Sequence, residues 1–337
     1  MRAVILTRHA DIEERPLELV DIPKPACKGN EVLLKVLACG VCHTELDEIE
    51  GRLKPAKMPI VLGHEIVGEI VRKGPDANTL EIGQRVGVTW LNSACGKCRF
   101  CQSGRENLCD GAKWTGLDVD GGYAQFTIVL EQFTYPLPDS FSDAQAAPLL
   151  CAGVIGYRAI RLAEISDGDV IGLYGFGASA HIVIQVLRYK YPASPVFVFT
   201  RSGEHRDLAK QLGAEWAGRP GDEPPARLNK AIDFTPVGET VKCALAVSDK
   251  GATVVINAIR KRTPLPELDY AEHLWHEREI KSVANVTAQD AREFLPLAAK
   301  IPIKCCVEEF ELVRAGDALI ELKNSRVNGA AVLIIPH

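Results

Sequence analysis

The stretch Gly172-Leu-Tyr-Gly175-Phe-Gly177-Ala-Ser-Ala180 decides the fold of the second half of the chain. It follows an apolar run and opens a helical apolar pattern over 182–187, which predicts a strand, a tight turn and a helix in succession. In this G-x-G-x-x-A spacing Gly175 permits the turn, Gly177 lets the backbone approach a pyrophosphate, and the small Ala180 allows close packing of helix on strand. The residues expected to bind a dinucleotide here are Gly175, Phe176, Gly177, Ala178, Ser179 and Ala180.

The rest of the chain divides around this loop. Short β-branched apolar runs alternate with helical patterns and lie at 170–174, 196–199 and 254–256. This alternation indicates a parallel α/β unit over residues 149–284. Before it, residues 1–148 contain short apolar runs broken by Gly and Pro, which predict a β-rich, barrel-like domain. The α/β rhythm ends near Ser282, and we expect residues 285–337 to return to the first domain.

Composition and charge restrict the classes of function. A chain of 337 residues exceeds one domain of about 150 residues. A hydrophobic content of 47% with 25% charged residues argues against disorder. Lys and Arg number 39 against 44 Asp and Glu, a net charge of -5, which argues against nucleic-acid and anionic-membrane partners. No apolar run suggests a secretory signal or approaches the ~20 residues of a membrane span, so we expect a cytoplasmic protein.

Four cysteines lie within fifteen residues, in the spacing C-x2-C-x2-C-x7-C. They are Cys95, Cys98, Cys101 and Cys109. Zinc prefers four tetrahedral thiolates in such a turn, and four protein ligands leave no open position, which predicts a structural zinc site. Buried free cysteines are the alternative. An iron–sulfur cluster is disfavoured because Asp110 follows the last cysteine in place of the usual continuation.

A second set of metal ligands is dispersed along the chain. Cys42 and His64 each lie beside a glycine-containing turn, and Cys151 stands where the first domain gives way to the second. Two cysteines and one histidine leave a fourth position for water or substrate, as in catalytic zinc sites. Taken singly, His64 could be a structural histidine and Cys151 a small buried apolar residue.

Several segments together resemble the zinc-dependent alcohol dehydrogenases of the medium-chain dehydrogenase/reductase superfamily. They are Cys39-Gly-Val-Cys-His-Thr-Glu-Leu46, Gly63-His-Glu-Ile-Val-Gly-Glu69, the four-cysteine segment, Asp120-Gly-Gly-Tyr-Ala-Gln125 and Cys151-Ala-Gly-Val. The resemblance extends over essentially the whole chain. It implies a GroES-like β-barrel catalytic domain, which carries the structural zinc, and a Rossmann cofactor domain with a doubly wound parallel sheet.

The resemblance also implies roles for single residues. The catalytic zinc ligands would be Cys42, His64 and Cys151, with Glu65 as a carboxylate that can approach the metal, Glu45 orienting His64, Thr44 taking the substrate proton and His43 reaching the pyrophosphate. His43 could equally be an exposed turn histidine. Where the family commonly continues the proton relay with a histidine, this chain has Asp47, which is either the outer relay group or a solvated turn carboxylate.

The end of the second α/β strand bears on the cofactor. NAD enzymes usually place Asp or Glu there to bind the adenosine ribose diol, but this chain reads Thr200-Arg201-Ser202. Arg201 is suited to a 2′-phosphate, which predicts a preference for NADP(H) with NAD(H) as a possible cofactor. The alternative is an arginine that faces solvent. Near the C-terminus, Asn328 occupies the region where relatives often have an arginine on the pyrophosphate.

These observations predict an alcohol dehydrogenase that uses two zinc ions per chain and interconverts alcohols with aldehydes or ketones. Its partners would be a small-molecule substrate and further copies of the chain, as a homodimer or homotetramer. A zinc-free enone or quinone reductase shares the fold but does not need Cys42, His64 and Cys151. A non-catalytic, zinc-stabilised binding protein is the alternative from another class.

Overall fold

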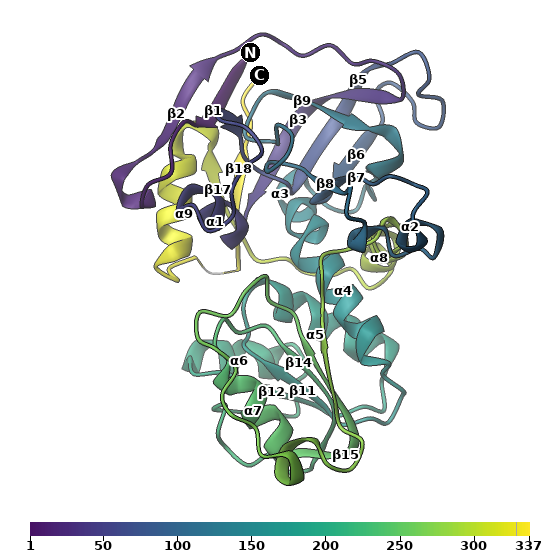
Figure 1. Ribbon diagram of the computed structural model, residues 1–337, viewed down its shortest axis with the longest axis vertical. Coiled ribbons are helices and arrows are strands. Elements are labelled where there is room, and N and C mark those ends of the chain that lie inside the picture. The colour runs from purple at the N-terminus through teal and green to yellow at the C-terminus, as the bar shows by residue number, and fades with distance from the viewer. Residues whose placement is uncertain (328) are drawn as a thin grey trace. The chain divides into compact units, whose positions relative to one another are not determined.

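The chain forms two compact units (Figure 1). The computed structural model describes residues 1–327 and 329–337, so the prediction made for Asn328 lies outside the described residues. The first unit comprises Met1–Cys151, Val286–Lys300 and Lys304–His337, and the second comprises Ala152–Asn285 and Ile301–Ile303.

The first unit is built mainly of β-sheet. Its strands are β1 (Arg2–Leu6), β2 (Leu17–Asp21), β3 (Glu31–Val41), β4 (Ile60–Val61), β5 (Ile66–Lys73), β6 (Arg85–Val88), β7 (Leu91–Ser93), β8 (Lys113–Trp114), β9 (Phe126–Leu130), β10 (Thr134–Pro136), β17 (Val307–Glu311) and β18 (Ala330–Ile334). Its α-helices are α1 (His43–Ile49), α2 (Arg99–Gln102), α3 (Asp143–Ala146), α8 (Ala288–Lys300) and α9 (Ala315–Lys323). The largest sheet runs β10-β6-β5-β3-β18-β17, with β9 also paired to β3.

Strand β3 is the centre of that sheet. It pairs antiparallel with β5, β9 and β18, and most of its side chains are buried. Val41, its last residue, lies opposite Ala331 of β18. The C-terminal strand therefore returns to the first unit, beside the point where the chain leaves β3 for α1.

The second unit is a six-stranded parallel sheet with helices. Its strands are β11 (Ile171–Tyr174), β12 (Val196–Phe199), β13 (Trp216–Gly218), β14 (Leu228–Asp233), β15 (Ser248–Ile256) and β16 (Glu279–Ser282), and its α-helices are α4 (Ala152–Ala163), α5 (Ala178–Lys190), α6 (Gly203–Gln211) and α7 (Glu239–Ala246). The order β13-β12-β11-β14-β15-β16 reverses direction between β11 and β14. This is the doubly wound topology that the sequence predicted, and it puts a ligand crevice at the carboxyl ends of β11 and β14.

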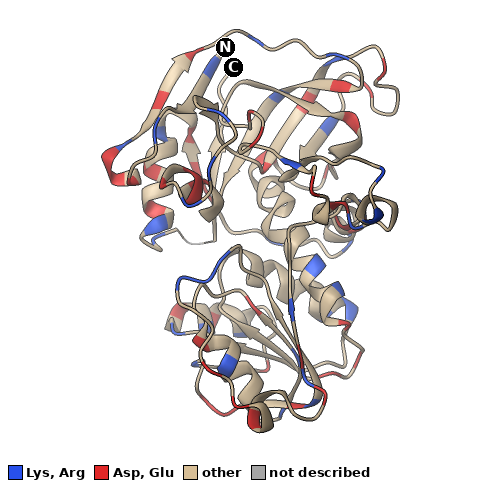
Figure 2. Ribbon diagram, viewed as in Figure 1, with Lys and Arg blue, Asp and Glu red and all other residues tan. Residues whose placement is uncertain are grey.

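Positive and negative side chains are distributed over the whole chain, and one helical stretch is strongly apolar. Lys and Arg alternate with Asp and Glu over both units (Figure 2). One helical stretch, Asp143–Ala163, is long and apolar enough to cross a membrane, with a mean hydropathy of 1.3 over 18 residues. By length alone it departs from our prediction that no such stretch exists. However, 67% of that window is buried inside the protein, as in the core helix of a globular protein.

Candidate functional site

Four predicted ligands converge in the first unit. Cys42, His64, Glu65 and Cys151 each offer an atom, and these atoms all lie within 4.8 Å of one another. Cys42 is the residue between β3 and α1, and His64 and Glu65 lie between β4 and β5. Cys151 directly follows the 3-10 helix Ala147–Leu150. The fold thus gathers residues that are more than a hundred positions apart.

Local structure fixes the orientation of these ligands. Glu45, on the first turn of α1, accepts a hydrogen bond from the Cys42 backbone N–H at 2.8 Å through Oε2. Its other oxygen lies 2.6 Å from His64 Nδ1. Gly40 is required beside Glu65, because a Cβ at Gly40 would lie 2.0 Å from the Glu65 carboxyl oxygen. Glu45 therefore holds His64 with Nε2 as its free nitrogen, as a carboxylate partner does in zinc sites.

The donor set fits a metal cation. His64 is 1% exposed, and its Nε2 has no hydrogen-bond partner among the described residues. Burial and the neighbouring Cys42 charge raise the pKa of Glu65 well above its usual range. A hydrogen bond with Cys151 lowers the pKa of the Cys42 thiol well below its usual range. The cluster thus concentrates more acidic groups than it can ionise together without a cation, and two sulfurs with one imidazole nitrogen match zinc.

The predicted proton-transfer residues follow Cys42 along α1. Thr44 is buried, and its Oγ1 lies 3.5 Å from Cys42 Sγ. Asp47 is 3% exposed, and one carboxylate oxygen accepts a hydrogen bond from Arg52 Nε at 2.5 Å. The alternative of a solvated turn carboxylate is therefore wrong for Asp47, because its carboxylate is buried and pairs with the partly exposed Arg52. His43 is exposed on the first turn of the helix.

Glu48 is a buried carboxyl that sequence reasoning missed. It is fully buried, and neither of its carboxyl oxygens has a hydrogen-bond partner among the described residues. Burial raises its pKa well above the usual range, and the charge of Glu45 acts in the same direction. The i, i+3 spacing from Glu45 on α1 places both carboxyls on one helix face, a signal that was readable in the sequence.

The four-cysteine segment forms a second candidate metal centre. The Sγ atoms of Cys95, Cys98, Cys101 and Cys109 lie within 4.8 Å of one another. Backbone N–H groups of Lys97 and Cys98 lower the pKa of the Cys95 thiol to about 6, which favours the thiolate that binds metal. Glu106, inside the segment, accepts a hydrogen bond from the Ala288 backbone N–H at 2.7 Å and so connects it to the start of α8.

The glycine loop joins β11 to α5. Gly175 has a φ of +82°, and its backbone N–H donates to Phe199 O at 2.8 Å. A Cβ added at Gly177, the residue before α5, would meet nothing within 4 Å, so the approach to the helix N-terminus is open. Ala180 is buried, as close packing requires. Phe176 is also buried, so its side chain packs into the protein and leaves its backbone for a ligand. Ala178 and Ser179 are half-buried on the first turn of α5.

Beside the end of β12 lies Arg206 of α6, an arginine that the sequence did not single out. Thr200 is buried, Arg201 is exposed, and Ser202 caps α6 by accepting a hydrogen bond from the His205 backbone N–H at 3.3 Å. Arg206 Nη1 donates to the carbonyl oxygens of Thr200 and Arg201, each at 2.9 Å. Its guanidinium is therefore fixed at the strand end, one turn into the helix.

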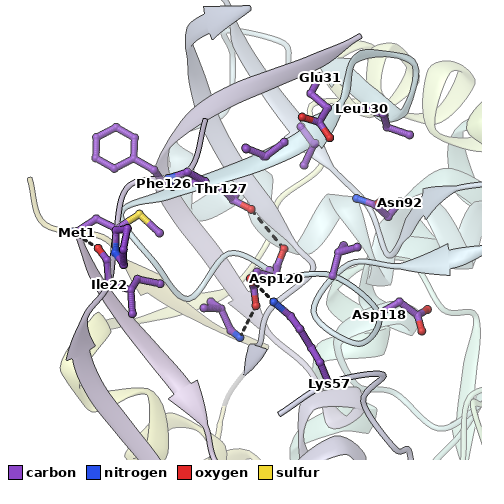
Figure 3. Close-up of a pocket in the computed structure, with 17 residues that line it drawn as sticks. Met1, Ile22, Glu31, Lys57, Asn92, Asp118, Asp120, Phe126, Thr127 and Leu130 are labelled. Atoms are coloured by element: carbon purple, nitrogen blue, oxygen red, sulfur yellow. Dashed lines mark hydrogen bonds and ion pairs between the residues drawn. The ribbon is translucent and has the colours of Figure 1, made fainter. Parts of the chain in front are cut away.

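A separate cavity in the first unit contains none of the predicted site residues. It has a volume of about 450 Å³ and is lined by residues that include Met1, Ile22, Asn92 and Phe126 (Figure 3). The ion pair of Lys57 with Asp120, at 2.6 Å, lies at this cavity. Neither group of metal ligands contributes to its lining, so the predicted chemistry lies elsewhere.

Comparison with known proteins supplies relatives for the whole chain. Residues 28–139 match the alcohol dehydrogenase GroES-like domain. The chain is 43% identical over 342 residues to a probable alcohol dehydrogenase, AdhA, of Mycobacterium tuberculosis, with 99% of this chain and 97% of that protein covered. It is 33% identical to an alcohol dehydrogenase of Geobacillus stearothermophilus, covering 95% and 96%. It is also similar to the structure of acetophenone reductase from Geotrichum candidum in complex with NAD, with a TM-score of 0.87, 26% identity, and 99% and 96% coverage.

Proposed function

Because this chain belongs to the alcohol dehydrogenase family of the medium-chain dehydrogenase/reductase superfamily, we propose that it interconverts alcohols and the corresponding aldehydes or ketones with zinc and NADP(H). The family resemblance and the fold class drawn from the sequence are thereby confirmed, and the chain is an NAD(P)-linked alcohol dehydrogenase. The observation that carries the zinc proposal is that Nε2 of buried His64, which lies among the sulfurs of Cys42 and Cys151, has no hydrogen-bond partner in the part of the chain that the structure describes.

Cys42, His64 and Cys151 would hold the catalytic zinc, with Glu65 as a fourth protein ligand when substrate is absent. Zinc in such a site acts as a Lewis acid that lowers the pKa of an alcohol hydroxyl or polarises a carbonyl. Glu45 fixes the ring of His64, so that Nε2 stays directed at the ligand cluster. A bound nicotinamide cofactor would supply or accept the hydride of the carbinol carbon, and a protein group would take or return the hydroxyl proton.

We assign that proton to Thr44, whose hydroxyl lies beside Cys42 Sγ. Asp47, one turn further along α1, is proposed as the outer acceptor of the relay. Arg52 Nε donates a hydrogen bond to Asp47 Oδ1, which fixes the position of that carboxylate. Because His43 is exposed on the same turn as Thr44, we propose that it contacts the cofactor pyrophosphate.

The NADP(H) preference rests on the end of β12. Thr200, Arg201 and Ser202 include no carboxylate of the kind that would bind a ribose diol and repel a 2′-phosphate. Arg206 adds a second guanidinium, which two backbone carbonyls hold in place. The residues 175–180 would bind the pyrophosphate at the N-terminus of α5. NAD(H) remains the alternative cofactor, with lower catalytic efficiency.

Three further features complete the proposal. Cys95, Cys98, Cys101 and Cys109 would bind a second, structural zinc, which makes two zinc ions per chain. We propose a homodimer or homotetramer located in the cytoplasm. An assay of alcohols and aldehydes with NADP(H) and NAD(H) tests the proposed reaction and the cofactor preference, and metal analysis tests the proposed zinc content. Active protein with one zinc or fewer per chain would refute the two-zinc assignment.

A further inference from the structure

The two halves of a dinucleotide would lie over different strands at the carboxyl ends of the parallel sheet. Strands β12 and β13 lie on one side of β11, and β14, β15 and β16 lie on the other. The loop after β11 takes the pyrophosphate, and the end of β12 takes the adenosine ribose. The nicotinamide half must therefore extend over the ends of β14 and β15. This assignment rests on the proposed function, since it requires that the chain bind NADP(H) or NAD(H).

Polar groups at the end of β14 are already engaged. Asp233 is fully buried and accepts hydrogen bonds from Lys261 Nζ at 2.6 Å and Thr240 Oγ1 at 2.9 Å. Thr235 donates its backbone N–H to Asp233, and its hydroxyl lies 2.6 Å from that of Thr240. The side chains of Asp233 and Thr235 are therefore already hydrogen-bonded to neighbouring protein groups.

Asn257, the first residue after β15, differs from Asp233 and Thr235 in its hydrogen bonding. Its side chain is 8% exposed, and its amide nitrogen Nδ2 has no hydrogen-bond partner among the described residues. The surrounding backbone is fixed, because Asn257 N–H donates to Asp233 O at 2.8 Å and Val283 N–H donates to Ile256 O at 2.9 Å. The amide can therefore reorient only about its own side-chain torsions.

A buried N–H donor without an acceptor is costly, which makes an acceptor supplied by a ligand favourable. In register, Tyr174 lies beside Asp233 and Asp233 beside Ile256. Asn257 thus stands two strands from Gly175, about 10 Å away at ~4.8 Å per strand. That span suits the distance from a pyrophosphate across a ribose to a nicotinamide ring.

We infer that Asn257 is a cofactor-positioning residue, which donates a hydrogen bond from Nδ2 to the carboxamide oxygen of the nicotinamide ring. The contact fixes the rotation of the ring about its glycosidic bond, and with it the face that exchanges hydride. An asparagine suits this role because its neutral amide donates equally to the oxidised and the reduced ring.

The test compares binding of NADPH with binding of 2′-phospho-ADP-ribose, which lacks the nicotinamide ring. Asn257→Ala should weaken NADPH about three- to tenfold, the range for one neutral hydrogen bond, and leave 2′-phospho-ADP-ribose unchanged. Asn257→Asp keeps the size and shape of the side chain but replaces the donating amide by a negatively charged carboxylate, which repels the carboxamide oxygen of the cofactor. Because only the oxidised ring carries a positive charge, this variant should weaken NADPH more than NADP⁺.

Asn229→Ala is the matched control. Asn229 lies near the amino end of β14, whereas the proposed cofactor contact lies at the carboxyl ends of the strands. Its Oδ1 accepts a hydrogen bond from the Val170 backbone N–H at 2.8 Å. This variant should lose thermal stability but bind both ligands normally. An equal loss of both ligands in Asn257→Ala, or no loss of either, would overturn the inference. If the wild-type protein bound neither NADPH nor NADH, the proposed function itself would fail, and the role of Asn257 with it.

Discussion

Replacing Arg206 by alanine tests the origin of the cofactor preference. Arg206 is half-buried, and its Nη1 is held by the carbonyl oxygens of Thr200 and Arg201. The adenosine ribose would lie at this end of β12. Because the side chain is already ordered, little rotamer entropy is lost when a phosphate binds. Removing Arg206 should therefore reduce the efficiency with NADP(H) more than that with NAD(H).

The size of the effect follows from exposure. A charge-assisted hydrogen bond contributes about 1.5–3 kcal/mol, and we take the lower end for half-buried Arg206, about a tenfold effect. Arg201 is exposed, and exposed ion pairs contribute about 0.2–1 kcal/mol, up to about fivefold. Arg206→Ala should thus lower the ratio of kcat/KM for NADP(H) over NAD(H) about tenfold, and Arg201→Ala less. Thr200→Asp should shift the preference toward NAD(H).

The assay needs a control for lost backbone contacts. Arg227 Nη1 also donates to two carbonyl oxygens, those of Ala246 and Ser248. However, Arg227 directly precedes β14 and so lies at the amino ends of the strands, away from the proposed cofactor site. Arg227→Ala should leave the cofactor ratio unchanged in the same kcat/KM measurements. An unchanged ratio in both Arg206→Ala and Arg201→Ala, or a wild type that prefers NAD(H), would refute the reasoning.

Three further predictions concern metal, proton transfer and stability. Cys98→Ser should lower both zinc content and Tm, whereas Cys42→Ser should lower zinc content and abolish turnover with Tm nearly retained; metal analysis and calorimetry distinguish them. Thr44→Ala should reduce kcat strongly and Thr44→Ser mildly, and equal rates would remove Thr44 from the mechanism. Burial opposes ionisation of Glu131, but N–H groups of residues 78–80 outweigh it and hold its pKa below the ordinary 4.5. Glu131→Gln should therefore lower the free energy of unfolding at pH 7. The difference in this free energy between wild type and variant, measured by urea titration, should shrink as the pH falls below about 4.5.

The sequence predicted those site residues that belong to short motifs. Cys42 and His64 each lie in a local pattern, and the parallel sheet follows from the apolar runs around Gly175. Arg206 and Asn257 were missed because their significance depends on which groups around them are already hydrogen-bonded. Only the packed structure determines that. The solvated alternative for Asp47 failed for the same reason, since the position of Arg52 depends on the turn that follows α1.

The pairing of β18 with β3 has a consequence for biosynthesis. Residues 38–41 lead directly to Cys42, yet their partners 331–334 are synthesised nearly three hundred positions later. Until then β3 presents an unpaired edge, which is a hazard for association with other chains. Pairing across nearly three hundred positions also makes closure of this sheet slow relative to the local βα units of the second half. We therefore expect the second unit to fold before residues 331–334 are synthesised, and the sheet that leads to Cys42 to be completed only after them.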